Sequence, residues 1–396
     1  LTTTAKSIHR TYQMRGYCSR AGYARIREVL HACRWLYNRS LEQRRNIYRV
    51  CGKSVTKFTQ LKQLTKLRAE QQAWRDLSIQ ISRGVLARLD RAFQAFFRRV
   101  KAGEKPGYPR FQGARRYQCI ELAEVTPGMV KGNSIKVKGL PVIRIRSSRP
   151  LPDSNQLKAL RLVMHGRILA VDLVYAEQTN PLSPNAVAVG IDMGVNERMT
   201  LSDGSTVERR VVDRKRERRL QRVISRRKRG SAGRRKAVAA FAREKRRNAI
   251  SNRNACHRIT TDLVRRFGYI AVEGLQIRNM TASGGSYKKG LNREVLGQTW
   301  GVIRQQLAYK AEWAGRQLVE VNPAYTSRTC SMCGFENDLA GEYRTFSCSK
   351  CGHVQDRDVN AARNVLARGN IAPATERWAL SGRAVLPETY TVNQSI

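Results

Sequence analysis

The amino-acid sequence predicts a multidomain α+β protein, because the spacing of its apolar residues changes twice along the chain. Residues 20–103 carry apolar side chains three and four positions apart, as amphipathic helices do. Residues 104–185 show short runs in which apolar and polar side chains alternate, as strands do. Residues 186–324 return to short apolar strands separated by helices, a pattern typical of an α/β sheet. The 396 residues are enough for two to four such domains.

The N-terminal half is predicted to be a small β-barrel with a helical lobe inserted after its first strand. We assign residues 1–19 to that strand, 20–103 to the lobe and 104–185 to the other strands, which follow a Pro/Gly-rich break at 103–111. Helices are expected near 21–37, 55–73 and 77–101, and strands at 4–17, 117–125, 134–138, 142–146, 158–164 and 167–175.

The charge balance predicts a polyanionic partner. The chain has 75 Lys and Arg against 30 Asp and Glu, so its formal net charge is 75 − 30 = +45, an excess that repels itself unless an anion neutralises it. Nucleic acid is favoured, because Lys and Arg contacts to phosphates release counterions. An anionic membrane surface is the alternative, but no apolar run is long enough to span a bilayer and no signal-peptide pattern opens the chain. We therefore expect a cytoplasmic, nucleoid-associated protein.

The basic residues are concentrated in residues 209–258, which hold 21 Lys and Arg and three acids. A thin apolar stripe predicts two helices within 209–267, broken at Gly230–Gly233. A solvated surface is one interpretation of so many charges. Because nearly all have one sign, we favour contact with a nucleic-acid backbone.

Four of the nine cysteines form two Cys-x2-Cys pairs separated by 14 residues, a spacing typical of a tetrahedral zinc site. The pairs are Cys330 with Cys333 and Cys348 with Cys351, and each is followed by a glycine that lets the turn tighten. His353 is an alternative ligand for one position. Because four thiolates leave no position open, the zinc ion is expected to be structural.

Three carboxylates lie at the ends of predicted elements. Asp192 ends an apolar strand between Gly190 and Gly194, which we interpret as clearance for a metal ion and a phosphate. Glu273 ends a second apolar strand, and Asp358 opens a helix. Carboxylates gathered in one place cannot all stay ionised without a cation, and their oxygens suit Mg²⁺ or Mn²⁺. Two such ions can activate water and hold a scissile phosphate.

Each carboxylate also has a structural interpretation. Asp192 would then be a turn residue, Glu273 the partner of an arginine, and Asp358 the N-cap of its helix. Asp356 is a further candidate ligand, but a side chain two residues from Asp358 would point elsewhere. The metal interpretation requires the three carboxylates to meet at one side of a mixed sheet.

Several motifs accompany these residues: Gly190–Gly194 (GIDMG), Ile270–Glu273 (IAVE), Tyr325–Gly334 (YTSRTCSMCG), Asp356–Asn364 (DRDVNAARN), Lys105–Phe111 (KPGYPRF) and Gln306–Trp313 (QLAYKAEW). Together they resemble the TnpB family, transposon-encoded RNA-guided DNA nucleases related to type V CRISPR effectors. The resemblance covers about 20–368 and is most specific over 186–368.

The resemblance implies a wedge β-barrel with an inserted helical recognition lobe, followed by a RuvC-like nuclease of RNase H fold. The nuclease would occupy 186–324, with a zinc finger inserted at 325–355 and a last helix at 356–368. Residues 369–396 show little periodicity and are expected to be a disordered tail.

The resemblance also makes Asp192, Glu273 and Asp358 the catalytic residues, which would bind two Mg²⁺ or Mn²⁺ ions. It implies that the protein carries a transposon-end guide RNA, one chain per RNA. Matched double-stranded DNA beside a short 5′ adjacent motif would be cleaved by phosphodiester hydrolysis. A compact type V CRISPR effector, a non-cleaving RNA-guided repressor and a DNA transposase are the alternatives.

Nucleic-acid contacts are implied as well. The family's motif-reading helix, matched to this chain, places Gln80 and Arg83 near the adjacent motif. The basic helices are expected to hold the guide–target duplex by its backbone, leaving sequence to base pairing. Candidate contacts there are Arg214, Arg218, Arg226, Arg227, Lys228, Arg234 and Arg235.

Overall fold

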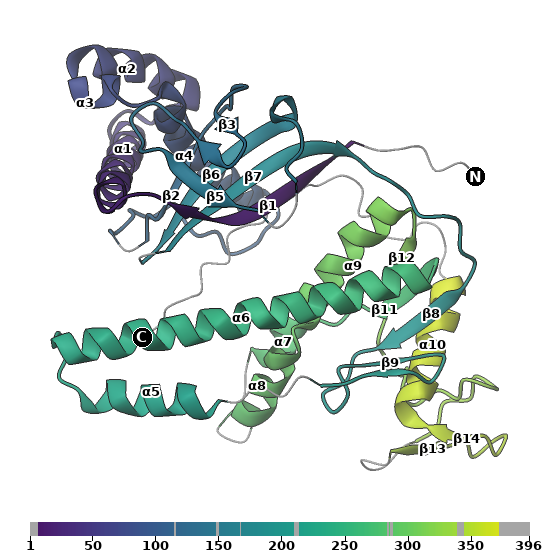
Figure 1. Cartoon of the computed structure of the whole chain (residues 1–396). Helices are drawn as coiled ribbons and strands as arrows, with labels where there is room; N and C mark the ends of the chain where they lie inside the picture. The colour runs from purple at the N-terminus through teal and green to yellow at the C-terminus, as the bar shows by residue number, and fades with distance from the viewer. Residues whose placement is uncertain are drawn as a thin grey trace. The chain divides into compact units, whose positions relative to one another are not determined.

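A computed structural model describes residues 7–114, 116–147, 150–166, 168–209, 214–282, 285, 288–338 and 344–371. The described residues fall into two compact units, an N-terminal unit of residues 7–178 and a C-terminal unit from residue 179 onward (Figure 1). The expectation of a disordered tail at 369–396 lies outside the described residues from 372 on.

The N-terminal unit is built on a seven-stranded antiparallel sheet in the order β2-β6-β7-β1-β5-β4-β3. Strand β1 lies at its centre and pairs with both β7 and β5. The strands are β1 (Ser7–Tyr17), β2 (Cys119–Glu121), β3 (Val130–Lys131), β4 (Ser134–Ile135), β5 (Ile143–Arg146), β6 (Leu157–His165) and β7 (Ile168–Gln178).

This sheet curls into a half-barrel, so the predicted β-barrel is borne out in part (Figure 1). Within the described residues, the edge strands β2 and β3 do not pair with each other, and they are too short to complete a ladder. A helix covers the β2 edge instead. At Gly84 of this helix a Cβ would collide with the carbonyl oxygen of Glu121, and Ala123 N–H donates to the Gln80 carbonyl at 3.1 Å.

Four helices lie between β1 and β2 in the chain, where the inserted helical lobe was expected. They are α1 (Arg20–Cys51), α2 (Lys57–Glu70), α3 (Gln72–Arg75) and α4 (Ile79–Lys101). The side chains of Ser19, Thr56 and Ser78 cap the N-termini of α1, α2 and α4, so each start follows from an N-cap residue. A short 3₁₀ turn, Ser154–Gln156, precedes β6.

The C-terminal unit contains a mixed five-stranded sheet in the order β10-β9-β8-β11-β12. Strands β8, β11 and β12 are parallel, β9 pairs antiparallel with β8, and β10 pairs antiparallel with β9 at the edge. The strands are β8 (Ala188–Asp192), β9 (Met199–Leu201), β10 (Thr206–Val207), β11 (Tyr269–Glu273) and β12 (Gln317–Val321).

Helices cover both faces of this sheet (Figure 1). Val189 and Ile191 of β8 point toward α6 and α9, whereas Ala271 and Val319 share a core with Val365 of α10 on the other face. The helices of the unit are α5 (Lys215–Arg226), α6 (Ala232–Arg266), α7 (Ile277–Thr281), α8 (Lys288–Gln298), α9 (Trp300–Ala314) and α10 (Arg357–Ile371), and a small hairpin joins β13 (Thr345–Ser347) to β14 (Val354–Asp356).

The apolar spacing of residues 294–314 predicts one helix, but the structure has two helices there. Thr299 adopts a left-handed backbone with φ 59° and separates α8 from α9. Thr299 Oγ1 lies 3.1 Å from Cys256 Sγ of α6, so a tertiary contact accompanies the break. No helix in the described ranges has the length and apolar character that crossing a bilayer requires.

Candidate active site and metal centre

Asp192 and Glu273 are the last residues of two neighbouring parallel strands, β8 and β11. The register pairs Ile191 with Val272, so the following two carboxylates emerge side by side at the same edge of the sheet. Successive strand residues point to opposite faces. Because Ile191 and Val272 face α6 and α9, Asp192 and Glu273 face α10, the helix that carries Asp358 in its first turn.

Helix α10 reaches these strands because residue 190 is glycine. A Cβ at Gly190 would collide with the carbonyl oxygen of Ala362, and one at Gly194 would lie 2.6 Å from the carbonyl oxygen of Glu197. The interpretation of these glycines as clearance for a metal ion and a phosphate is therefore wrong. Their missing side chains admit protein backbone, and Gly190 sets how close Asp358 comes to the strands.

Asp356, rather than Asp358, caps α10. One oxygen, Asp356 Oδ1, accepts the backbone N–H groups of Asp358 and Val359 at 2.9 and 3.0 Å. An N-cap carboxylate satisfies amides that have no partner within the helix. The N-cap interpretation of Asp358 is therefore wrong, and its carboxylate is not used for capping.

Burial raises the pKa of all three carboxyl groups, and at Asp192 repulsion by the other two adds to it. Burial is the main reason that the pKa of Asp192 rises to about 8, and the charges of Glu273 and Asp358 raise it further. Burial likewise raises the pKa of Glu273, against the hydrogen bond from Thr326, and the pKa of Asp358, which Asp356 raises too. At neutral pH the metal-free group therefore retains a proton that a cation would displace.

Thr326 was not predicted from the sequence as a site residue. Its buried hydroxyl donates to Glu273 Oε1 at 2.8 Å, and its own carbonyl oxygen accepts Asn364 Nδ2 at 2.9 Å. Asn360 Nδ2, one turn earlier on α10, donates to the Thr329 carbonyl at 2.8 Å. The sequence did contain one signal for this contact: Asn360 and Asn364 are four residues apart in a predicted helix and therefore lie on the same face. They tie the segment before the cysteines to α10.

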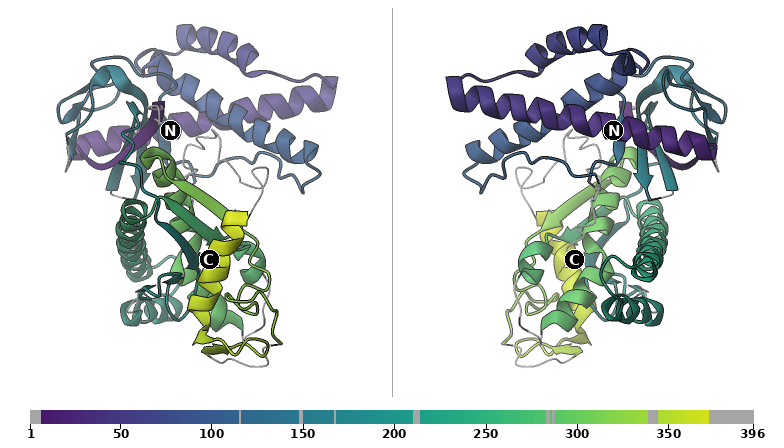
Figure 2. Two further views of the ribbon diagram at one scale, coloured as in Figure 1. Left: turned by 90° about the vertical axis from the view of Figure 1, so that its right-hand side faces the viewer. Right: turned by 90° about the vertical axis from the view of Figure 1, so that its left-hand side faces the viewer.

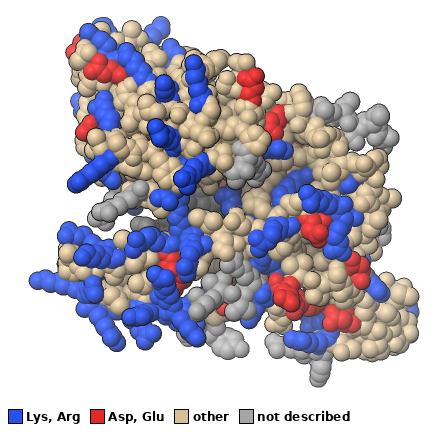
Figure 3. All heavy atoms as spheres, viewed as in Figure 1, with Lys and Arg blue, Asp and Glu red and all other residues tan. Residues whose placement is uncertain are grey.

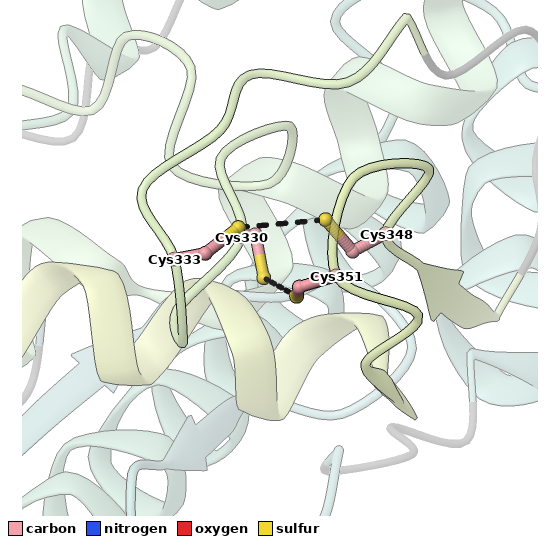
Figure 4. A group of neighbouring side chains, drawn as sticks. All are labelled: Cys330, Cys333, Cys348 and Cys351. Atoms are coloured by element: carbon pink, nitrogen blue, oxygen red, sulfur yellow. Dashed lines mark hydrogen bonds between the residues drawn. The ribbon is translucent and has the colours of Figure 1, made fainter.

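The four cysteines converge as predicted (Figure 4). Their sulfur atoms all lie within 4.8 Å of one another, with Cys330 Sγ 3.7 Å from Cys351 Sγ and Cys333 Sγ 3.6 Å from Cys348 Sγ. Four ligands about 2.3 Å from a zinc ion stand about 3.8 Å apart, so the thiols fit this metal. The backbone N–H of Cys351 lowers the pKa of Cys348 to about 6, which favours the thiolate.

The residues around the cysteines also fit a structural site. Gly334 and Gly352 have φ 75° and 73°, in the left-handed region that the tight turns need. His353 Nε2 lies 2.9 Å from Gln355 Oε1, and His353 is not part of the cysteine group. Within the described ranges, no other three or more His, Cys, Asp or Glu side chains converge this closely, so the carboxylate group is looser than the cysteine group.

The basic helices α5 and α6 form a hairpin whose acids are buried. Glu217 accepts Asn248 Nδ2 at 2.7 Å and pairs with Lys245 at 3.4 Å, and Glu244 pairs with Arg247 at 2.6 Å and with Arg216 at 3.5 Å. Lys and Arg dominate the outer surface of these helices (Figure 3). Of the predicted contacts, Arg218, Arg226, Arg227, Lys228 and Arg235 are exposed, and Arg214 and Arg234 are half-buried.

Gln80 and Arg83 lie in the first turns of α4, where both meet Glu124. Gln80 Nε2 donates to Glu124 Oε2 at 3.0 Å, and Arg83 Nη1 lies 3.8 Å from the same oxygen. The two predicted motif contacts therefore share one surface, and an acid lies between them.

The chain is 31% identical over 393 residues to "Putative RNA-guided DNA endonuclease InsQ" of Escherichia coli (strain K12), which spans 93% of this chain and 94% of that protein. The chain belongs to the TnpB family of RNA-guided DNA endonucleases. A "Putative RNA-guided DNA endonuclease" of Streptomyces pristinaespiralis is 30% identical over 93% of this chain and 91% of its own length. The resemblance to the TnpB family is confirmed.

Two family models match parts of this TnpB chain. The model described as "Probable transposase" matches residues 172–284, which include Asp192 and Glu273. The model described as "Cas12f1-like, TNB domain" matches residues 300–365, which include the four cysteines and Asp358. The solved "Cryo-EM structure of the Cas12f1-sgRNA-target DNA complex" is similar in fold, with a TM-score of 0.59 and 15% identity over 91% of this chain and 98% of that one.

Proposed function

We propose that this protein is an RNA-guided DNA endonuclease whose cleavage site is the group of Asp192, Glu273 and Asp358. In this proposal the C-terminal unit is a RuvC-like nuclease of RNase H fold, and 325–355 is a zinc finger inserted in it. The observation that carries the proposal is the meeting of two strand-end carboxylates with a third from α10, close enough that each raises the pKa of Asp192. Such a group stays ionised only with a cation.

The residues present fit one or two Mg²⁺ or Mn²⁺ ions, because hard carboxylate oxygens are their preferred ligands. Bound there, the metal would polarise a phosphodiester and lower the pKa of an attacking water. Asp192, Glu273 and Asp358 are the residues that would hold the ions. Thr326 holds Glu273 in one orientation by its 2.8 Å hydrogen bond. The cysteine group would hold a structural zinc ion.

The nucleic-acid partners are proposed from the charge distribution and from the family. The relatives' printed names describe RNA-guided DNA endonucleases, and the solved complex contains an sgRNA and a target DNA. We propose that one chain carries one transposon-end guide RNA and that the exposed cations of α5 and α6 hold its duplex with DNA by the backbone. The N-terminal unit would be the wedge and recognition lobe, with Gln80 and Arg83 near the 5′ adjacent motif.

The test is cleavage by the purified protein with its guide RNA, a matched linear DNA and Mg²⁺. Asp192→Asn should still bind the target and should leave it uncut, because the amide removes a metal ligand and keeps the side-chain shape. Exposed Asp203→Asn, on the β9–β10 turn, is the control and should cut like the parent. Equal cutting by Asp192→Asn would overturn the site assignment, and binding without cutting by the parent would favour the repressor alternative.

A further inference from the structure

The C-terminal ends of α1 and α4 extend beyond the sheet of the N-terminal unit (Figure 2). There, Phe96, Phe97 and Tyr108 contact one another, and Phe111 joins Tyr108 through the guanidinium of Arg45, which lies over both rings. We call this group the aromatic platform. Large fractions of its side chains are exposed: 59% for Phe97, 42% for Tyr108 and 45% for Phe111. Clusters of exposed apolar side chains often mark binding surfaces.

The rings are ordered among themselves. Phe96 lies 5.2 Å from Phe97 and 5.3 Å from Tyr108, both near-perpendicular, and Tyr108 also packs edge-on against the buried Phe93 at 5.6 Å. Aromatic pairs at these separations stabilise one another beyond their burial. The buried ring of Phe93 thus holds Tyr108 in place, while Phe97, Tyr108 and Phe111 remain accessible to solvent.

The segment that carries Phe111 is fastened to α1. Asn38 Nδ2 donates to the Gln112 carbonyl at 3.1 Å, and Gln112 N–H donates to Asn38 Oδ1 at 2.8 Å. Two turns further along α1, the guanidinium of Arg45 lies over Phe111 at 5.3 Å and over Tyr108 at 6.0 Å. These contacts set the rings and the cation in place before any ligand arrives, which lowers the cost of binding.

Positive charge predominates around the platform, where the segment 97–111 carries five Lys and Arg against one acid, Glu104. Within the described residues, Arg45, Arg98, Arg99, Lys101 and Arg110 form no ion pair, although all five lie on or beside the platform's own helices and segment. The neighbouring Asp90 pairs with the buried Arg44 at 3.3 Å, so it does not neutralise them. A second copy of this chain would bring more positive charge to this surface, whereas a polyanion would relieve it.

We propose that the aromatic platform stacks unpaired bases of a single-stranded nucleic acid, while the surrounding arginines and lysines hold the phosphates. Rings beside uncompensated cations are the combination that single-strand binding uses, because every base has a flat face. A continuous duplex does not fit this chemistry, because its bases are already stacked. The proposal rests on the proposed nucleic-acid function and adds where an unpaired stretch is held.

The test compares how tightly the full-length protein binds oligonucleotides with bases and an oligonucleotide without bases. Fluorescence anisotropy would measure the binding of a labelled 12-nucleotide oligouridylate, the matching oligothymidylate, and an abasic strand with the same phosphates. Phe111→Ala should weaken binding of a base-bearing strand by about fivefold or more, since a stacked base contributes about 1–3 kcal/mol. It should leave binding of the abasic strand unchanged. Whichever of the RNA and DNA strands responds identifies the strand held.

Two variants serve as controls. Phe111→Trp retains a stacking face and should bind like the parent. Phe58→Ala removes a ring that is 71% exposed on α2, with Lys57 5.4 Å from its centre but outside the platform, and should have no effect. Equal loss for strands with and without bases, or no loss at all, would overturn the proposal. The proposal would also be overturned if the parent were a dimer and Phe111→Ala a monomer, because a second copy of the chain would then cover the platform. If the parent binds none of the strands, the nucleic-acid function itself falls.

Discussion

Thr326 Oγ1 donates a hydrogen bond of 2.8 Å to Glu273 Oε1, and both side chains are buried. The donor belongs to the segment that leads into the cysteines, and the acceptor ends a central strand. The bond thus connects the cysteine site to the carboxylate group. It also lowers the pKa of Glu273 against the effect of burial.

Thr326→Val should slow DNA cleavage by about tenfold, because a hydrogen bond to a charged group contributes about 1.5–3 kcal/mol and valine keeps the shape. Thr326→Ser restores the hydroxyl and should recover most of the rate. Single-turnover cleavage over a range of Mg²⁺ concentrations measures both. If serine and valine variants are equally slow, the methyl group matters and the hydrogen bond does not.

The metal-free protein should become less stable as pH rises from about 4 to about 8. Asp192 has a pKa of about 8 in the fold against an ordinary value of 3.8, so in this window the folded chain binds a proton that the unfolded chain releases. Below pH 3.8 Asp192 is protonated in both the folded and the unfolded chain, so its contribution to the free energy of unfolding no longer changes with pH. Asp192→Asn should make the free energy of unfolding less dependent on pH. Urea unfolding in magnesium-free buffer measures it, and parallel curves for parent and variant would contradict the assignment.

Gly190→Ala should destabilise the C-terminal unit by about 2 kcal/mol, because the new methyl group collides with the backbone of α10 and overpacking of this kind costs about 1–3 kcal/mol. Gly290→Ala is the matched control, since nothing lies within 4 Å of a Cβ there and the residue is in a helix. It should be neutral or stabilising by up to about 1 kcal/mol. Thermal unfolding compares them, and a neutral Gly190→Ala would mean that α10 does not set this distance.

Cys348→Ser should lower bound zinc from about one ion per chain to none and should also slow cleavage. The second effect follows because Asn360 and Asn364 join the segment 326–331 to α10, so disorder at the cysteines loosens Thr326. Cys51→Ser, at an exposed thiol outside the cluster, is the control. Metal analysis beside cleavage rates tests the coupling. Zinc loss with an unchanged rate would show that the two sites are independent.

The parts of the site that could be predicted from the sequence are those with a continuous apolar run or a fixed spacing. Two short apolar runs were enough to place Asp192 and Glu273 at strand ends, and the cysteine spacing was enough to predict a cluster. The hydrogen bond from Thr326 could not be predicted, because it joins residues 53 positions apart. The role of Gly190 was misread for the same reason, since the backbone that needs its space lies more than 170 residues away.

The misses in the fold have similar causes. The break at Thr299 lies between Gly297 and Gly301, but the continuous apolar spacing outweighed these glycines in the prediction, and a contact with Cys256 accompanies the break. The sheet was predicted to be a barrel because short strands with turns are typical of barrels. Helix α4 covers the edge strand β2, and this contact requires Gly84 at the point of closest approach, which no local pattern reveals.

Glu217 and Glu244 lie inside the hairpin of α5 and α6, and their partners are cations of the same two helices. The two acids therefore stabilise the hairpin from inside, and most of the other Lys and Arg side chains are exposed. These buried ion pairs would hold the helices together without a bound nucleic acid. If α5 and α6 hold a duplex as proposed, replacing either acid would destabilise the hairpin and leave the cations that contact phosphates in the chain.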